Sequence, residues 1–167
     1  MKYWNMQNKV LRWVLLGVFA AAIAVVTTIS MPIPGGNGYI HLGDGIIILA
    51  AMVLGPAGAI AAGVGSALAD IMLGFAIYAP VSFALKFLMG LIVGIFYRRK
   101  GGVFSFVMNI VFFLLAELIM VAGYFAYECI LYSFASALAG VPANAIQACS
   151  GIIIGAVFAP FVKKIKL

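Results

Sequence analysis

Long apolar segments separated by short breaks constrain this chain more than any other feature of its sequence. Six such segments cover residues 10–30, 43–54, 57–73, 79–97, 103–127 and 142–162. A helix needs about 20 apolar residues to cross the hydrocarbon core of a bilayer, so the second segment is short for a span. Because only 8% of the 167 residues are charged, the chain could not coat a soluble globule. We therefore predict an all-α membrane protein, a single domain over residues 1–167 built as a bundle of six transmembrane helices.

The basic residues indicate how these helices are oriented. In a six-span arrangement nine of the ten lysines and arginines fall on one side of the membrane: Lys2, Lys9, Arg12, Arg98, Arg99, Lys100, Lys163, Lys164 and Lys166. The cytoplasmic loops of membrane proteins carry an excess of Lys and Arg, so both termini are expected in the cytoplasm. The net charge of +6 thus reflects orientation in a lipid bilayer, and no nucleic-acid partner is expected.

The sequence contains few residues that could bind a metal or catalyse a reaction. Cys129 and Cys149 lie outside any CxxC motif and His41 is the one histidine, whereas a zinc or iron–sulfur site needs three or four ligands. Neither cysteine has an evident base beside it, and the sequence contains no GxxxxGK[ST] phosphate loop. We expect no metal, no cofactor and no enzymatic activity.

All four acidic residues and one lysine lie near the predicted outer face. At about 1.5 Å per helical residue, the outer third of the bundle contains Asp44, Asp70, Lys86, Glu117 and Glu128. A charge inside a bilayer costs about 2.5–3.5 kcal/mol on insertion scales, so such a cluster faces a cavity or pairs internally. Lys86 could pair with Glu117 or Asp70 as a purely structural ion pair, and Asp44 could simply cap its helix. Glu117 is expected to face the cavity, either paired with Lys86 or bound to the ligand.

Aromatic and amide side chains gather at the same level. They are Tyr39, Phe75, Tyr78, Tyr124, Tyr127, Tyr132, Asn144 and Gln147. Tyrosines at this depth also serve as ordinary interface anchors. Together with the charged cluster, they describe a pocket for a small, polar, ring-bearing molecule. The predicted substrate-binding residues are Asn37, Tyr39, His41, Asp44, Tyr78, Lys86, Glu117, Tyr124, Glu128, Asn144 and Gln147.

Short motifs occur in a fixed order through nearly the whole chain. They are Ala20-xxx-Ala24, His41-Leu-Gly-Asp44, Gly55-Pro56, Ala67-Leu-Ala-Asp70, Tyr78-Ala-Pro80, Gly123-Tyr-Phe-Ala-Tyr-Glu128 and Val141-Pro-Ala-Asn144-x-x-Gln147. Their order and spacing resemble the S component, the substrate-binding membrane subunit, of energy-coupling factor (ECF) vitamin transporters. Within that family the chain is most similar to members for hydroxymethylpyrimidine or pyridoxine-type vitamins.

The resemblance carries further expectations. It implies a six-helix bundle in the plasma membrane of a prokaryote that binds its vitamin at the extracellular side, closed over by the first loop. It implies a transmembrane T component and two cytosolic ATPase subunits as partners, with Ala20 and Ala24 as the docking surface. These alanines also belong to a stripe of small residues, for which packing inside the bundle is the plainer explanation.

The identity of the ligand and the class of transporter stay open at this point. Four carboxylates against Lys86 and His41 favour a neutral, zwitterionic or weakly basic heteroaromatic ligand over a free anion. Hydroxymethylpyrimidine, pyridoxine and thiamine all fit that description. A stand-alone secondary transporter or channel for a small polar solute would also use buried carboxylates, as a proton relay.

Overall fold

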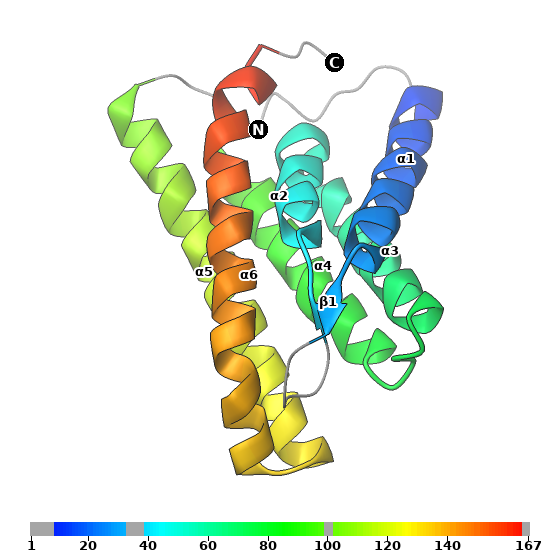
Figure 1. Cartoon of the computed structure of the whole chain (residues 1–167). Helices are drawn as coiled ribbons and strands as arrows, with labels where there is room; N and C mark the ends of the chain where they lie inside the picture. The colour runs from blue at the N-terminus through cyan, green and yellow to red at the C-terminus, as the bar shows by residue number, and fades with distance from the viewer. Residues whose placement is uncertain (1–8, 33–38, 99–101, 165–167) are drawn as a thin grey trace.

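The computed structural model describes residues 9–32, 39–98 and 102–164, most of which form six α-helices (Figure 1). The elements are α1 (Lys9–Thr28), β1 (Met31–Pro32), β2 (Tyr39–Ile40), α2 (Gly43–Leu54), the 3-10 helix η1 (Gly55–Ala57), α3 (Gly58–Met72), α4 (Ala79–Phe96), α5 (Val103–Leu131) and α6 (Phe134–Val162). The two short strands pair antiparallel, and the core fills with side chains such as Ile47, Met89 and Phe113. The prediction of an all-α membrane protein agrees with this arrangement.

Helices α2 and α3 form a tight reversal. Gly55 adopts a positive φ of 61° and Pro56 lacks a backbone N–H, so α2 ends there. Gly58 then packs so closely on α2 that a Cβ there would lie 2.7 Å from the carbonyl oxygen of Ala50. By length and composition, five segments of the described chain qualify as membrane spans, with Gly43–Met72 counted as one. The six crossings expected from the sequence therefore stay a prediction.

Helices α5 and α6 form a long hairpin that projects at the lower end of the bundle in Figure 1. Each has 29 residues, or about 44 Å at 1.5 Å per residue, which exceeds the roughly 30 Å of a bilayer core. We expected the last helix to begin at Pro142, which was wrong. It begins at Phe134 because the Ser133 hydroxyl caps it, accepting a hydrogen bond from the backbone N–H of Ser136 (3.2 Å), and its interior accommodates the proline.

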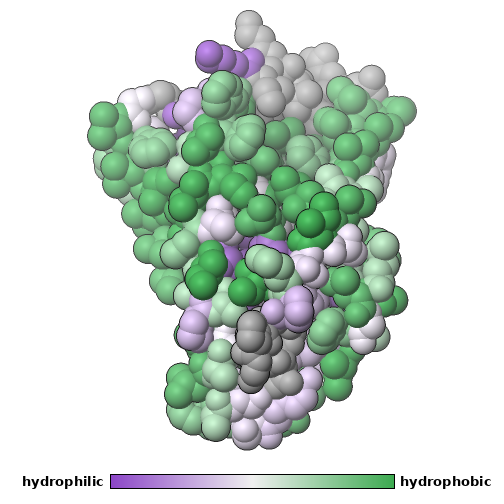
Figure 2. All heavy atoms as spheres, viewed as in Figure 1, coloured by the Kyte–Doolittle hydropathy of each residue, from purple (hydrophilic) through white to green (hydrophobic). Residues whose placement is uncertain are grey.

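Large apolar side chains cover the outside of the bundle, as lipid contact requires. Figure 2 shows hydrophobic residues over most of one face of the molecule. Residues with more than half of their surface exposed include Val10, Trp13, Ile29, Ile130 and Ile153. Such a surface suits a protein surrounded by hydrocarbon.

The close approach of α4 to η1 predicts that alanine substitutions at Gly94 and Gly17 differ in their effect on stability. Gly94→Ala would place a methyl group 2.6 Å from the backbone nitrogen of Pro56, and overpacking of this kind costs about 1–3 kcal/mol. We expect the detergent-solubilised variant to melt below the wild type. Gly17→Ala is the matched control, since nothing lies within 4 Å of a Cβ there, and it should melt at or slightly above the wild-type temperature. Equal melting temperatures for the two variants would contradict this packing.

Candidate functional site

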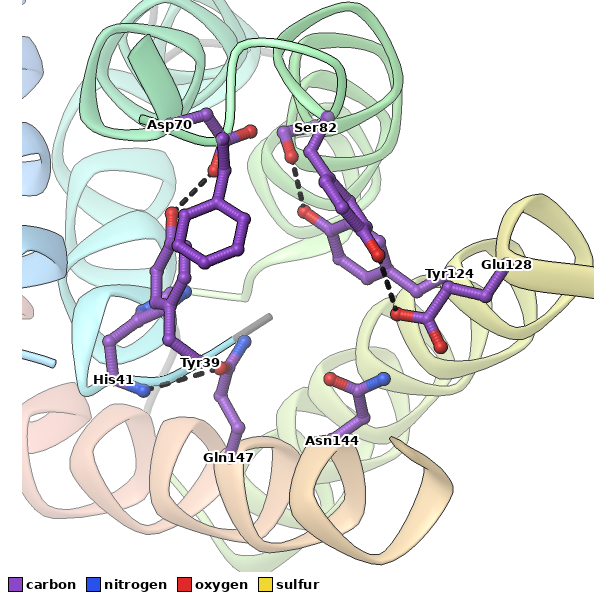
Figure 3. A pocket seen from close by; sticks show the side chains of 10 residues that line it. Tyr39, His41, Asp70, Ser82, Tyr124, Glu128, Asn144 and Gln147 are labelled. Atoms are coloured by element: carbon purple, nitrogen blue, oxygen red, sulfur yellow. Dashed lines mark hydrogen bonds between the residues drawn. The ribbon is translucent and has the colours of Figure 1, made fainter. Parts of the chain in front are cut away.

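A cavity lies where several elements meet (Figure 3). Strand β2, the C-terminal ends of α3 and α5, the N-terminal end of α4 and the N-terminal half of α6 all contribute to its wall. The lining residues are Tyr39, His41, Asp70, Phe75, Tyr78, Ser82, Tyr124, Glu128, Asn144 and Gln147. Segments far apart in the sequence thus supply a single site.

Aromatic rings form a continuous row along this cavity. The ring centroids of Tyr39 and Phe75 lie 5.2 Å apart, and those of Phe75 and Tyr78 lie 6.2 Å apart. Tyr78 and Tyr124 follow at 6.4 Å, while the imidazole of His41 lies 5.5 Å from the Tyr39 ring. All of these distances fall within the 4.5–7 Å typical of interacting rings. The row gives a flat ligand a surface on which to stack.

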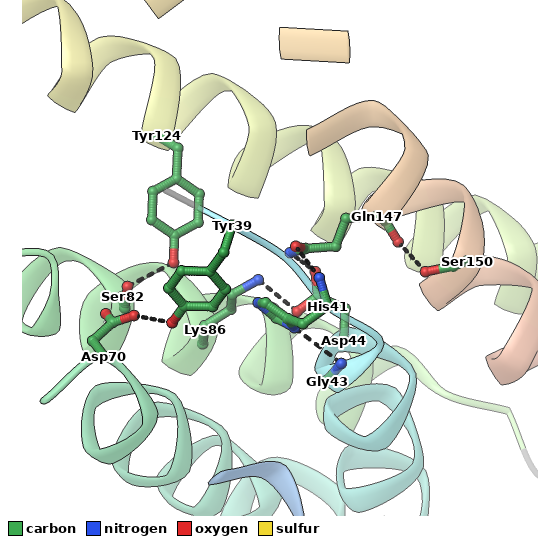
Figure 4. A network of polar contacts seen from close by, with 10 residues as sticks. All are labelled: Tyr39, His41, Gly43, Asp44, Asp70, Ser82, Lys86, Tyr124, Gln147 and Ser150. Atoms are coloured by element: carbon green, nitrogen blue, oxygen red, sulfur yellow. Dashed lines mark hydrogen bonds and ion pairs between the residues drawn. The ribbon is translucent and has the colours of Figure 1, made fainter. Parts of the chain in front are cut away.

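A buried polar network adjoins the cavity (Figure 4). The Lys86 ammonium and the Asp44 carboxylate form an ion pair with an Nζ–Oδ1 distance of 2.5 Å, and both side chains are at least 99% buried. Gln147 donates from Nε2 to Asp44 Oδ2 (2.7 Å) and accepts at Oε1 from the backbone N–H of His41 (3.4 Å). These two bonds fix the orientation of the Gln147 amide, so the ion pair positions a residue that lines the cavity.

His41 is held as a neutral side chain beside this network. Its Nδ1 accepts a hydrogen bond from the backbone N–H of Gly43 (3.0 Å), which requires an unprotonated nitrogen. Burial lowers the pKa of His41 to about 4, and Lys86 acts in the same direction against the opposing effect of Asp44. At neutral pH His41 therefore brings a polar ring to the cavity and no charge.

Two tyrosine hydroxyls hold the two carboxylates of the cavity wall. Tyr39 donates to Oδ1 of Asp70, and Tyr78 donates to Oε1 of Glu128 (3.3 Å). Burial is the main cause that raises the pKa of both tyrosines, so both hydroxyls are protonated donors at neutral pH. A hydrogen bond between two hydroxyls joins Ser82 and Tyr124 in the cavity wall, with 2.7 Å between the oxygens.

The structure gathers most of the predicted binding residues around this cavity. Those that line it are Tyr39, His41, Tyr78, Tyr124, Glu128, Asn144 and Gln147. Asp44 and Lys86 lie below it in the buried network. Asn37 lies outside the described residues.

Pairing within the charged cluster differs from what we expected. Lys86 pairs with Asp44, not with Glu117 or Asp70, and Asp44 makes this ion pair where we had considered a simple helix cap. Glu117 is fully buried but does not line the cavity, and neither of its oxygens has a hydrogen-bond partner among the described residues. Instead it lies against Gly151 of α6, where a Cβ would clash with its Oε1. Glu117 therefore does not face the cavity as we expected.

Three lining residues were absent from the predicted binding set. Asp70 and Phe75 were placed at the correct level by sequence, yet without a stated role at the site. Ser82 was seen only as a small residue of a packing stripe. Its position four residues before Lys86, one helical turn away on the same face, was the signal that could have found it. In the described parts of the chain, no three His, Cys, Asp or Glu side chains are grouped as a metal site would require.

Comparisons with known proteins agree with this architecture. Residues 7–165 match the family described as ECF-type riboflavin transporter, S component. A Pyrococcus woesei protein described as uncharacterized is 37% identical over 145 residues, which cover 86% of this chain and 95% of that protein. The thiamine precursor transporter HmpT of Lactococcus lactis subsp. cremoris (strain MG1363) is 31% identical over 163 residues, 95% of this chain and 92% of that protein.

A solved structure shares the fold. It is described as the S component of a bacterial ECF transporter and superposes with a TM-score of 0.67 at 23% sequence identity. The match covers 90% of this chain and 92% of the other. At that identity the likeness concerns the helix arrangement alone.

The buried ion pair predicts a non-additive pair of substitutions. Lys86→Met leaves the Asp44 carboxylate buried without its counter-ion, which typically costs 3–5 kcal/mol, roughly the stability of a marginal protein. We expect a large fall in melting temperature in detergent. The double variant Lys86→Met/Asp44→Asn should recover much of it, because the charge is gone and an amide oxygen still accepts from Gln147. Losses that simply add would contradict the pairing.

Proposed function

Because the chain belongs to the family of ECF-type riboflavin transporter S components, we propose that it is the substrate-binding membrane subunit of an ATP-driven ECF transporter. Its ligand is a small vitamin or vitamin precursor, and a thiamine precursor of the hydroxymethylpyrimidine type fits best. The likeness to HmpT supports that ligand and gives no support to pyridoxine. The observation that carries the proposal is the cavity, which offers a stacking surface and hydrogen-bonding groups in one site.

The chemistry of the cavity favours a heteroaromatic ligand that carries hydrogen-bonding groups. Tyr124 offers a ring face against which the ligand stacks. The amides of Asn144 and Gln147 both donate and accept, as the edge of a heterocycle requires.

The distribution of charge supports binding from the extracellular side. Lys9 begins α1, Arg98 follows α4 and Lys163 follows α6, and these helix ends share the upper end of the bundle in Figure 1. The Tyr97 hydroxyl donates to the carbonyl of Ala159 (3.0 Å), which ties the end of α4 to the end of α6. The cavity lies toward the opposite end. By the positive-inside rule the basic end, with both termini, is cytoplasmic and the cavity opens outward.

The proposed partners are a transmembrane T component and two cytosolic ATPases. Docking was expected at Ala20 and Ala24, but α1 packs these residues toward α3: Ala24 is 6% exposed, and a Cβ at Gly65 would clash with the Ala20 carbonyl oxygen. The small residues that α1 leaves open are Gly17 and Ala21, one turn apart. Docking at Ala20 and Ala24 stays a prediction, and it requires α1 to move or the partner to meet a neighbouring face of the helix.

Ligand binding by the purified protein tests the proposal. Calorimetry should detect binding of hydroxymethylpyrimidine, and riboflavin should bind more weakly. Tyr124→Ala should weaken it by roughly 5- to 150-fold, because stacking of a base on an aromatic ring is worth about 1–3 kcal/mol. Phe125→Ala is the matched control at the next residue of α5, since Phe125 does not line the cavity and its ring packs against Phe134. A wild-type protein that binds riboflavin more tightly would overturn the proposed ligand.

Uptake in whole cells separates the proposal from a stand-alone secondary transporter. Cells that produce this protein with the T component and ATPases should accumulate the labelled vitamin. Uptake should stop when the ATPases carry inactivating substitutions in their nucleotide sites, while binding by the purified protein persists. Uptake that continues without ATP hydrolysis would favour the secondary transporter.

Accessibility labelling tests the proposed orientation. With Cys129 and Cys149 replaced, a cysteine introduced at Lys164 should react with an impermeant maleimide only in inside-out vesicles. A cysteine at the exposed Ser133, which precedes α6, should react only in intact cells. Labelling in the reverse pattern would place the cavity on the cytoplasmic side and overturn the proposed direction of uptake.

A further inference from the structure

Two carboxylates on opposite sides of the cavity are each only half satisfied (Figure 3). Asp70 is 5% exposed and Glu128 is 3% exposed, and both line the cavity. Each gives one oxygen to a tyrosine hydroxyl, Tyr39 for Asp70 and Tyr78 for Glu128. The other oxygen of each, Oδ2 and Oε2, is buried without a hydrogen-bond partner among the described residues.

This arrangement contrasts with the network beneath it. There, both oxygens of Asp44 are engaged, one by Lys86 and the other by Gln147 (Figure 4). An unsatisfied buried polar group costs about 1–3 kcal/mol, and more when it is charged, so such groups in a native protein call for a partner. Asp70 and Glu128 both line the space that a ligand would fill.

Local packing keeps the two free oxygens in place. The tyrosine hydroxyls hold one oxygen of each carboxylate and so limit rotation of the group. Beside Glu128, a Cβ at Gly140 of α6 would lie only 2.9 Å from Oε2, so the absence of a side chain there gives the carboxylate its room. The two carboxylates are thus held in the cavity wall before any ligand enters.

The charge around the cavity also favours a ligand that donates hydrogen bonds over an anion. Among its described lining residues there is no lysine or arginine, and His41 is neutral. The nearby ammonium of Lys86 is already paired with Asp44. Nothing in this lining offers an anion a charged partner.

We propose that Asp70 and Glu128 determine specificity by accepting hydrogen bonds from two separate donor groups of the ligand. This inference rests on the proposed binding function and narrows its substrate class. The ligand is an uncharged or cationic heteroaromatic ring bearing amino or hydroxyl donors at two positions. Its phosphorylated derivatives are excluded. Hydroxymethylpyrimidine carries two such donors, an amino group and a hydroxymethyl group.

Isosteric substitutions test each acceptor. Asp70→Asn and Glu128→Gln replace a charge-assisted hydrogen bond by a neutral one at best, so each should weaken hydroxymethylpyrimidine binding by roughly 3- to 30-fold. Asn109→Ala is the control for a buried polar side chain of α5 away from the cavity, because Asn109 is fully buried and bonds the backbone of Arg98. It should change affinity by less than about twofold. An equal loss in all three variants would mean that a general loss of structure weakens binding, and would overturn the inference.

Ligand analogues distinguish the loss of one contact from the loss of the fold. The analogue without the amino group should bind the wild type at least about tenfold more weakly. Whichever of Asp70→Asn and Glu128→Gln has lost the partner of that group should bind this analogue no more weakly than the wild type does, as a double-mutant cycle requires. Equal wild-type affinity for the two ligands would refute recognition by donors.

The phosphate ester of hydroxymethylpyrimidine tests the exclusion of anions. It should bind the wild type at least about 100-fold more weakly than the parent, since like-charge contact costs several kcal/mol. In Asp70→Asn and Glu128→Gln the ratio of the affinities for the parent and the ester should be smaller. A purely steric exclusion of the phosphate would leave that ratio unchanged and contradict the inference. Failure of the wild type to bind the parent compound would overturn the proposed function itself. Normal binding by the lining variants would overturn only the role of Asp70 and Glu128.

Discussion

The ion pair between Lys86 and Asp44 is the interaction on which the rest of this structure depends. Neither charge is tolerable in a hydrocarbon environment alone, so the start of α2 and the middle of α4 must stay together. Gln147 completes the arrangement by bonding Asp44 from α6. Three helices are thereby fixed at one level, and the cavity is built directly on that level. Any arrangement that separated the pair would leave a buried charge uncompensated, so the pair disfavours other packings of these three helices.

The remaining walls of the cavity follow from how the chain reverses direction. The Gly55-Pro56 break returns α3 alongside α2, which brings Asp70 beside Tyr39 of β2. The length of α5 and α6 carries Glu128 and Asn144 beyond the other helices, to the far side of the same space. A small vitamin would thus contact residues of β2, α3, α4, α5 and α6 and the segments between them, and none of α1 or α2. That leaves α1 to face lipid on one side and α3 on the other.

Depth in the bundle could be predicted from the sequence, whereas the partner of each side chain could not. Counting residues from the helix ends placed Tyr124, Glu128 and Gln147 at the level of the cavity, and there they lie. Pairing depends on the rotation of each helix about its axis, which weakly amphipathic helices such as α5 do not reveal. Glu117 and Lys86 were therefore given the wrong partners. The start of α6 was missed because the capping residue Ser133, and not Pro142, sets the beginning of the helix.

The burial of every acidic side chain has a consequence for the exterior of the molecule. The chain contains four Asp and Glu residues, and each is at least 95% buried. One of the ten basic residues, Lys86, pairs with Asp44 in the interior, and no acidic side chain lies on the surface. The positive charge of the exterior is therefore balanced by the surroundings, where anionic lipid headgroups attract a basic residue near the membrane surface by about 1 kcal/mol. The lipid headgroups thus supply the negative charge that the surface of the protein lacks.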